Sequence, residues 1–245
     1  MVRHSRSCEQ EEAIVSGDVF CAPDHSHSAL VTIDVQTDTL DGQPLEIPGT
    51  SQILPRLREL TRAFRDVGRT IVHAVRIYRS DGSNVDLCRR QEVSQGAPWL
   101  KPETPGVQLA RELFESPIWL DCERLLAGRV QEVGPEEYVI YKPRWGAFFQ
   151  TPLEQLLRPK DINTLVFAGC NFPNCPRTSI YEASERDFRL VLATDAISGL
   201  YNRGATEMRN IGVQLQLTSD IIAAFRRPML IKENTGSTDG NQSGD

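Results

Sequence analysis

Short apolar runs alternate with amphipathic segments along residues 28–232. Six of the runs have the length and the branched composition of buried strands: 29–36, 70–78, 137–142, 163–169, 189–196 and 213–218. Four other segments have helical patterns: 51–68, 151–158, 176–187 and 219–227. Strands that alternate with helices predict a three-layer α/β/α fold, with a mostly parallel sheet of about six strands covered on both faces.

Capping residues mark the expected ends of these helices. Gly68 is expected to close the first helix, because glycine is common just past a helix end. Thr151 and Ser219 stand where N-caps are expected, since a hydroxyl group there can accept a hydrogen bond from a free backbone N–H. Pro176 is favoured at the first helical position, which makes Cys175 the predicted N-cap of its helix.

The chain divides into one domain and two extensions. Residues 1–27 lack steady periodicity and are expected to form a loosely ordered arm. Residues 233–245 are polar and rich in glycine and serine, which predicts a disordered tail. Residues 28–232 form a single predicted domain. Inside it, the excursion 79–134 carries turn signals and some helical content, and an excursion of that length favours a lid, a pocket wall or a subunit contact.

Composition narrows the class of protein. The 245 residues are 40% hydrophobic and 24% charged, which is typical of a globular protein and excludes a fibrous or disordered one. The formal charge of −6 argues against binding to the phosphate backbone of nucleic acids. The sequence has neither a membrane-length apolar stretch nor the apolar run of a signal peptide at its start. We therefore expect a cytoplasmic protein without a nucleic-acid or membrane partner.

The cysteines and histidines give little support for a disulfide framework or a metal site. The six cysteines lie at positions 8, 21, 88, 122, 170 and 175, and free thiols in a reducing compartment are the better interpretation for a chain of this size. Four residues separate Cys170 from Cys175, which is not the spacing of zinc ribbons or thioredoxins. His25 and His27 lie in a polar segment, where an exposed loop is favoured over a metal site.

Three reactive residues follow predicted strands. Ligands of open α/β sheets bind beyond the carboxyl ends of strands, where we find Asp34, Lys142 and Cys175. Each has a structural alternative: a carboxylate bonded to a loop, a solvated strand end and a buried small hydrophobic residue. If the strands bring the three together, the ammonium offsets the burial of the carboxylate and favours the thiolate. A helix N-terminus at Cys175 would lower the thiol pKa as well.

Three blocks carry a resemblance to a known family, in the order ALVTIDVQTD, YKPRWGAFFQTPLEQLLR and VFAGCNFPNCPRTSIYEASERDFRLVLATDAISG. With these blocks the chain resembles the isochorismatase-like cysteine hydrolase superfamily over roughly residues 29–226. Each block contributes one member of the family's Asp-Lys-Cys triad. The resemblance implies that Asp34 is the general base, Lys142 the lysine of the triad and Cys175 the nucleophile.

The resemblance also implies an oxyanion hole. Relatives have a cis peptide bond in the loop before the cysteine, and matching positions place it here between Cys170 and Asn171. In relatives this bond turns a backbone N–H toward the oxyanion. The N–H groups of Asn171 and Cys175 are therefore the expected oxyanion hole.

Departures from the family pattern narrow the expected chemistry. Nicotinamidases of the superfamily carry an Asp/His-rich metal site after the second strand, where this chain offers only His73, so we expect no metal and no cofactor. Isochorismatases proper do not need the cysteine, so Cys175 favours hydrolysis of a C–N bond, in an amide, lactam, carbamoyl or ureido group of a small molecule, through a thioester. The alternatives are hydrolysis of a non-amide bond, as in isochorismatases, and a thiol redox or sensor protein that uses Cys170 and Cys175.

Candidate substrate-binding residues surround the expected triad. Thr39 replaces an aromatic residue of the family and predicts a more polar pocket floor. Arg76 and Tyr78 could hold a substrate carboxylate or carbonyl, or form a salt bridge with Asp81 or Asp86.

Aromatic residues could line the pocket. Trp145, Phe148 and Phe149 follow the triad lysine, although core packing is favoured for at least one of the two phenylalanines. Phe172, in the loop before the nucleophile, could face substrate. Trp99 and Trp119 could belong to a lid or a subunit contact. We expect a homo-oligomer, either a dimer or a tetramer.

Overall fold

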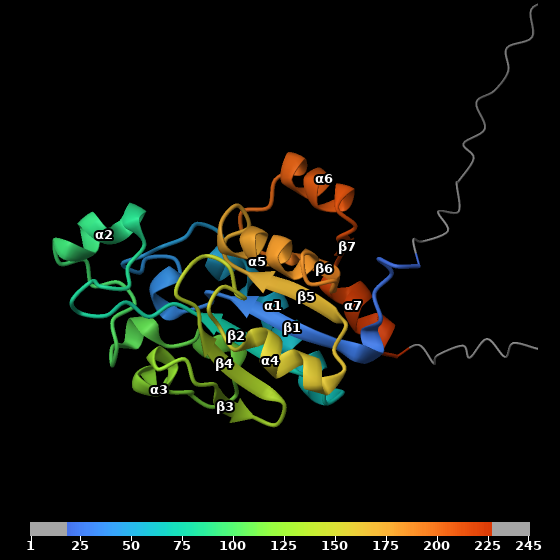
Figure 1. Cartoon of the computed structure of the whole chain (residues 1–245), viewed down its shortest axis with the longest axis horizontal. Coiled ribbons are helices and arrows are strands. Elements are labelled where there is room, and N and C mark those ends of the chain that lie inside the picture. The colour runs from blue at the N-terminus through green and yellow to red at the C-terminus, as the bar shows by residue number, and fades with distance from the viewer. Residues whose placement is uncertain (1–18, 227–245) are drawn as a thin grey trace, which may run out of the picture.

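The fold is built on one twisted sheet (Figure 1). A computed structural model of the protein describes residues 19–226. The seven strands of the described residues are β1 (Ser28–Ile33), β2 (Ile71–Val75), β3 (Gln131–Gly134), β4 (Glu137–Tyr141), β5 (Thr164–Gly169), β6 (Arg189–Ile197) and β7 (Gln214–Gln216). Their order is β3-β4-β2-β1-β5-β6-β7. All neighbours pair in parallel except β3 and β4. The predicted α/β fold with a mostly parallel sheet is confirmed.

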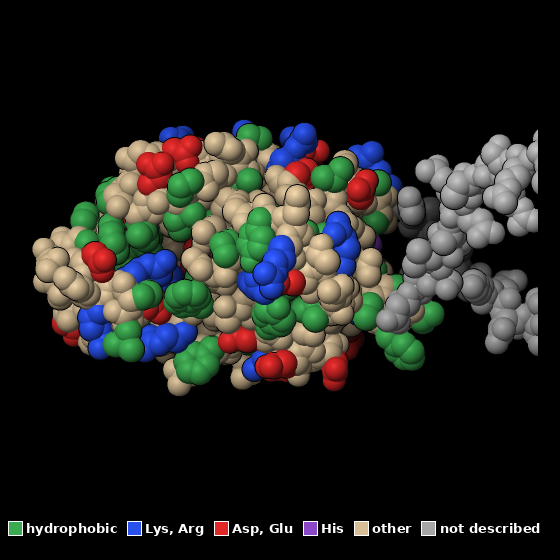
Figure 2. All heavy atoms as spheres, turned by 90° about the horizontal axis from the view of Figure 1, so that it is seen from above, with side chains coloured by type: hydrophobic (Ala, Val, Ile, Leu, Met, Phe, Trp, Pro, Cys, Tyr) green, Lys and Arg blue, Asp and Glu red, His purple; other side chains and the backbone are tan. Residues whose placement is uncertain are grey.

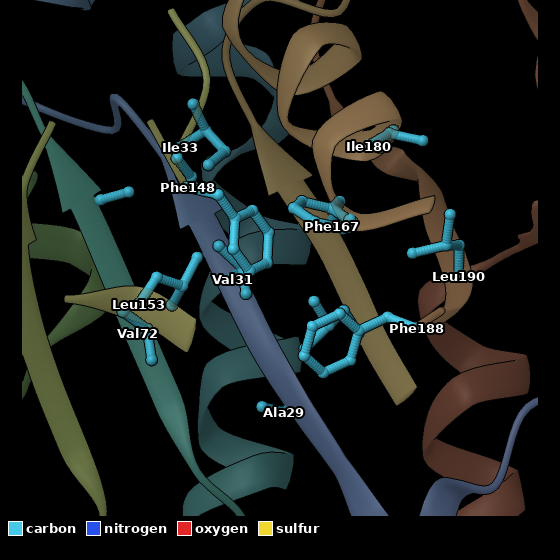
Figure 3. Packing of buried hydrophobic residues seen from close by; sticks show 14 of the residues in the cluster. Ala29, Val31, Ile33, Val72, Phe148, Leu153, Phe167, Ile180, Phe188 and Leu190 are labelled. Carbon is cyan, nitrogen blue, oxygen red and sulfur yellow. The ribbon is translucent and has the colours of Figure 1, made fainter. Parts of the chain in front are cut away.

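Helices cover both faces of the sheet. The α-helices of the described residues are α1 (Thr50–Asp66), α2 (Leu87–Ser94), α3 (Cys122–Leu126), α4 (Leu153–Leu157), α5 (Cys175–Ser184), α6 (Asn202–Asn210) and α7 (Thr218–Phe225). Apolar side chains of α1 and α7 pack on one face, against Leu30 of β1 and Val166 of β5. Side chains of α4, α5 and α6 pack on the other face, where Figure 3 shows Phe148 near Val31 of β1 and Leu153 near Val72 of β2. The sheet is therefore the middle of three layers, because its central strands are buried on both faces.

The excursion 79–134 has a hydrophobic core of its own beside the sheet. Buried side chains from the excursion, including Val85, Leu100 and Leu125, pack against Val75 of β2 and Val139 of β4. In Figure 1 its helices α2 and α3 lie at the end of the molecule where β2 and β4 finish. The excursion therefore packs beside the carboxyl ends of β2 and β4.

One strand and three helices were not located from the sequence: β3, α6, and the helices α2 and α3 of the excursion, for which only some helical content was predicted. Strand β3 (Gln131–Gly134) lies inside the excursion, at an antiparallel edge of the sheet. Its residues are mostly polar and only half-buried, so they have no strand pattern. Helix α6 (Asn202–Asn210) buries only Gly204 and Met208, so its apolar pattern is too sparse to predict. Both β3 and α6 are peripheral, where burial imposes little periodicity on a sequence.

The predicted helix ends are correct in part. Gly68 directly follows the end of α1 and takes a φ of 64°, which glycine adopts without strain. Thr151 is not the N-cap of α4, which is Pro152, but its hydroxyl accepts a hydrogen bond of 3.3 Å from Leu153 N–H. Ser219 is not an N-cap, because α7 begins at Thr218. Thr218 N–H, at the start of α7, instead donates a hydrogen bond of 2.8 Å to the Asp195 carboxylate.

Parts of the predicted domain limits lie outside the described residues. The N-terminal arm up to residue 18 and the predicted tail 233–245 are among the residues outside 19–226. Where the arm is described, Asp24 lies against β5, since its backbone N–H donates to the Thr164 hydroxyl at 3.0 Å. Within 19–226, no helix has the length and apolar character needed to span a membrane.

Candidate functional site

The three predicted reactive residues come together at the carboxyl end of the sheet. Asp34 directly follows β1, Lys142 directly follows β4, and Cys175 is the first residue of α5 beyond β5. Lys142 Nζ lies 2.9 Å from Asp34 Oδ2. The Cys175 thiol is close enough to both charges for each of them to shift its pKa. Parallel strands that end at one edge therefore assemble the predicted constellation.

The pair of charges is deeply buried. Lys142 is 0% exposed and Asp34 is 6% exposed. A buried carboxylate needs a nearby cation or hydrogen-bond donors, and Lys142 supplies the cation. The second carboxylate oxygen, Oδ1, is buried and has no hydrogen-bond partner of ordinary geometry among the described residues. This oxygen is free to accept a proton.

The backbone at Asp34 is held in an unusual conformation. Its φ is 52°, in the left-handed region that residues with side chains rarely adopt. Its carbonyl oxygen accepts from the Thr39 hydroxyl at 3.1 Å and from the Cys170 thiol at 3.0 Å. Thr39 is buried, and its hydroxyl also donates to Gln36 O at 2.7 Å. The Thr39 hydroxyl therefore holds the Asp34 loop, and its part in a polar pocket floor stays a prediction.

The Cys175 thiol is neutral in the resting protein. Burial raises its pKa to about 11, and the Asp34 carboxylate raises it as well, while Lys142 and Arg76 lower it by less. The expected lowering of the pKa is therefore wrong, because loss of solvent outweighs the nearby cations. The predicted N-cap position is also wrong by one residue, since Asn174 is the N-cap of α5 and Cys175 begins the helix.

The loop before Cys175 turns at a glycine. Gly169 has a φ of 113°, and a Cβ atom there would lie 2.3 Å from Ile33 O. All peptide bonds of the described residues are trans, so the expected cis bond between Cys170 and Asn171 is wrong. A non-proline cis bond costs about 3 kcal/mol, whereas glycine makes this turn with trans bonds. Within the described residues, the backbone N–H groups of Asn171 and Cys175 have no hydrogen-bond acceptor.

Arg76 and Tyr78 lie at the same end of the sheet. Arg76 is 2% exposed, and its Nη2 lies 2.8 Å from Asp86 Oδ2. The Tyr78 hydroxyl donates to the same carboxylate oxygen at 3.2 Å. Of the two predicted salt-bridge partners, Asp86 is therefore correct. Asp81 accepts a hydrogen bond from the backbone of Ser83 in its own loop.

A groove of about 630 Å³ opens beside the buried triad. It lies between α2 and α5 and is lined mainly by Leu87, Cys88, Trp145 and Phe149, with Asp86 at one side. In Figure 2, hydrophobic and basic side chains lie together at the left end of the molecule, where Figure 1 places α2. The side chains of Asp34, Lys142 and Cys175 do not line the groove.

The aromatic candidates separate into groove and core. Trp145 and the exposed Phe149 line the groove, whereas Phe148 is buried in the core, as predicted for at least one phenylalanine. Phe172 is 0% exposed and packs edge-on against Tyr201, with ring centroids 5.7 Å apart. The expectation that Phe172 faces substrate is wrong, because its ring fills the space between α5 and α6.

The remaining histidines and cysteines have structural surroundings. His73 is buried between Thr32 and Glu137, with contacts of 2.7 and 2.8 Å. No group of three His, Cys, Asp or Glu side chains with metal-binding geometry occurs within residues 19–226. Cys170 carries a free thiol whose pKa burial raises to about 12. Such a thiol reacts slowly with oxidants, so the structure gives no support to the redox alternative.

Three residues have supporting roles that the sequence did not predict. Cys170 and Thr39 fix the Asp34 carbonyl, and no sequence pattern marks this role. Arg89 was also missed, although it follows Asp86 by three residues at the start of α2. Its Nη1 lies 3.5 Å from Asp86 Oδ2 and 3.3 Å from the Tyr78 hydroxyl. The spacing of three on one helix could have suggested this contact.

Comparisons with known proteins agree with this geometry. The profile of the isochorismatase domain matches residues 28–118 and 126–220. The chain is 31% identical over 217 residues to a ureidoacrylate amidohydrolase of Methylorubrum extorquens, and the match covers 82% of each chain. It is 28% identical over 196 residues to a probable inactive nicotinamidase of Arabidopsis thaliana, covering 77% of this chain and 91% of the relative.

Solved structures give the same result. An isochorismatase family protein from Desulfovibrio vulgaris superposes with a TM-score of 0.69 at 27% identity, covering 82% of this chain and 99% of the other. A cysteine hydrolase from Pseudomonas syringae, at 18% identity, shares the fold with a TM-score of 0.65, covering 82% of this chain and 93% of the other. Sequence and fold therefore lead to one conclusion: the chain belongs to the isochorismatase family.

Proposed function

We propose that the protein is a hydrolase of carbon–nitrogen bonds other than peptide bonds, acting on a small amide, lactam, carbamoyl or ureido compound. The observation that carries the proposal is the buried ion pair of Lys142 and Asp34, 2.9 Å long, beside the Cys175 thiol. Relatives support the type of reaction, since they include a maleamate amidohydrolase, ureidoacrylate amidohydrolases and an N-carbamoylsarcosine amidase.

In the first half of the proposed reaction, Cys175 attacks the substrate carbonyl. Because the resting thiol is neutral, its proton passes to the free Oδ1 of Asp34 as the S–C bond forms. The carbonyl oxygen becomes an oxyanion and accepts hydrogen bonds from the unpaired N–H groups of Asn171 and Cys175. Asp34 then gives its proton to the leaving nitrogen, the C–N bond breaks, and a thioester remains on Cys175.

In the second half, water replaces the amine. The Asp34 carboxylate takes a proton from water while the oxygen attacks the thioester carbonyl. The second oxyanion collapses, the C–S bond breaks, and the sulfur recovers a proton from Asp34. The Lys142 ammonium, 2.9 Å from Asp34 Oδ2, offsets the negative charge of the carboxylate between the steps. The cycle produces an acid and ammonia or an amine, and in our proposal it needs no metal or cofactor.

Ammonia release from a panel of small amides, ureas and lactams tests the proposal. We expect turnover by the unmodified chain, retained after prolonged EDTA treatment and dialysis, and none by Cys175→Ala. Cys88→Ala is not a suitable control, because Cys88 lines the groove. Cys122→Ala removes a buried thiol outside the site and should keep the activity. Turnover that survives in Cys175→Ala would refute the proposal. The expected assembly into a dimer or tetramer stays a prediction.

A further inference from the structure

The guanidinium of Arg76 is buried without enough acceptors. Its Nη1 donates to Pro143 O at 3.0 Å, but Nε and Nη2 have no hydrogen-bond acceptor of ordinary geometry among the described residues. The residue is 2% exposed, so water at the surface does not supply the missing acceptors. Leaving a buried N–H unpaired costs stability, more so for a charged group. The site around Arg76 therefore lacks hydrogen-bond acceptors for two of the guanidinium nitrogens.

The nearest carboxylate does not satisfy this group. Asp86 Oδ2 lies 2.8 Å from Arg76 Nη2, but without the N–H direction of a hydrogen bond. The same oxygen accepts from the Tyr78 hydroxyl at 3.2 Å and lies 3.5 Å from Arg89 Nη1. One carboxylate is thus divided among two guanidinium groups and a phenol. It cannot neutralise both cations.

The charges near the nucleophile are unbalanced. Three cations, on Lys142, Arg76 and Arg89, face only two carboxylates, on Asp34 and Asp86. The Cys175 thiol adds no negative charge, because burial raises its pKa to about 11. The cluster therefore carries one excess positive charge. An anion bound there would restore neutrality in a region that excludes water.

The unsatisfied nitrogens have the geometry for a carboxylate. Nε and Nη2 lie along one edge of the guanidinium, and two parallel N–H bonds from such an edge fit the two oxygens of a carboxylate. Burial works against the charge of Arg76, but the guanidinium is near enough to Asp34 for that carboxylate to help raise its pKa. A carboxylate held by this edge would place the rest of a small molecule beside the nucleophile.

We propose that Arg76, supported by Arg89, binds a carboxylate of the substrate, so that the substrates are short carboxylic acids that also carry the amide or carbamoyl group. This inference deepens the proposed function and rests on it for the identity of the reacting bond. The binding step can nevertheless be measured without turnover.

Anion binding to Cys175→Ala tests the inference independently of catalysis. We expect malonate and succinate to raise the Tm of this variant, and their neutral diamides, malonamide and succinamide, to leave it unchanged. The Tm increase should disappear in Cys175→Ala/Arg76→Gln. It should persist in the control Cys175→Ala/Arg62→Gln, in which an exposed arginine of α1 is replaced. Equal Tm shifts with diacids and diamides, or an undiminished shift without Arg76, would overturn the inference.

Turnover gives a second measurement. In the unmodified chain, kcat/KM for succinamate should exceed that for its neutral analogue butyramide, and Arg76→Gln should reduce the succinamate value about 10- to 100-fold, the scale of a hydrogen bond to a charged group. The butyramide value should change far less. An equal loss for both substrates would show a merely structural role for Arg76 and contradict the inference.

Arg89→Gln is the second variant if Arg76→Gln does not fold. Arg89 is less buried, and its loss should weaken succinate binding to Cys175→Ala while malonamide and succinamide remain without effect. Unchanged succinate binding would contradict the support that we assign to Arg89, and equal binding of acid and diamide would again refute the inference. Absence of ammonia release with retained succinate binding would refute the proposed reaction and leave the carboxylate site standing.

Discussion

Replacing Asp34 by asparagine should change the reactivity and the catalytic power of Cys175 in opposite directions. In the native protein the Asp34 carboxylate helps to raise the thiol pKa, because a thiolate beside it would be repelled. Asp34→Asn removes this repulsion and leaves the cations of Lys142 and Arg76, which lower the pKa. The thiol of the variant should therefore ionise more readily. The same substitution removes the proton acceptor that the proposed attack requires.

The magnitudes follow from the position of the pKa. With a pKa of about 11, roughly 3 in 10⁴ of the Cys175 thiols are ionised at about pH 7.5. Each unit by which the pKa falls in Asp34→Asn raises that fraction about tenfold. Turnover should fall by about 10² to 10⁴ in kcat, the usual scale for loss of an acid–base group. A variant with a more reactive nucleophile would thus be a much poorer enzyme.

The assay is the rate of Cys175 alkylation by iodoacetamide as a function of pH, followed by peptide mass spectrometry. The midpoint of the profile reports the pKa and does not depend on how slowly the reagent enters the buried site. We expect a midpoint near 11 in the native chain and a lower one in Asp34→Asn. Exposed Cys88 provides an internal control in the same sample. A native midpoint below neutral pH, or an upward shift in the variant, would refute the reasoning.

The other predictions concern stability. Lys142→Met leaves Asp34 unpaired in the interior and should lower the free energy of unfolding by about 3–5 kcal/mol in urea titrations, whereas adding Asp34→Asn should recover part of the loss. Burial raises the pKa of Glu137, but hydrogen bonds from Arg65 and His73 outweigh it and hold the pKa at about 2, below its ordinary 4.5. Glu137 should therefore account for about 3 kcal/mol of the stability that the native chain loses as pH falls from 4.5 through 2, and the loss in Glu137→Gln should be smaller by about that amount. Gly169→Ala should destabilise the fold by about 1–3 kcal/mol more than Gly128→Ala, since both have positive φ but only Gly169 meets backbone atoms; equal Tm values for the two variants would contradict the clash.

The central sheet could be predicted from the sequence because it is buried on both faces. Every residue of β1 and β5 is buried, so these strands are nearly continuous apolar runs that can be recognised in the sequence. The edge strand β3 and the surface helix α6 have no such constraint, and their polar residues resemble those of loops. Burial on both faces, more than any local preference, made the fold predictable.

The site could be predicted in position but not in electrostatics. Asp34 and Lys142 directly follow strands, and Cys175 begins the helix after β5. The carboxyl ends of parallel strands lie at one edge of the sheet, so the meeting of the three could be expected. The thiol pKa depends on how completely the surrounding chain excludes water, which a sequence does not specify. For the same reason Phe172 could not be assigned to pocket or core, because both uses need an aromatic ring after the strand.

The most direct test of the proposed chemistry is the mass of the protein during turnover. Acid quenching within the first turnovers on an active amide, followed by peptide mass spectrometry, should show the acyl group of the substrate on the peptide that contains Cys175 and on no other cysteine. Asp34→Asn should show little or no adduct, because the leaving nitrogen receives no proton. Steady turnover with no covalent adduct at Cys175, or with an adduct at a different residue, would contradict the account.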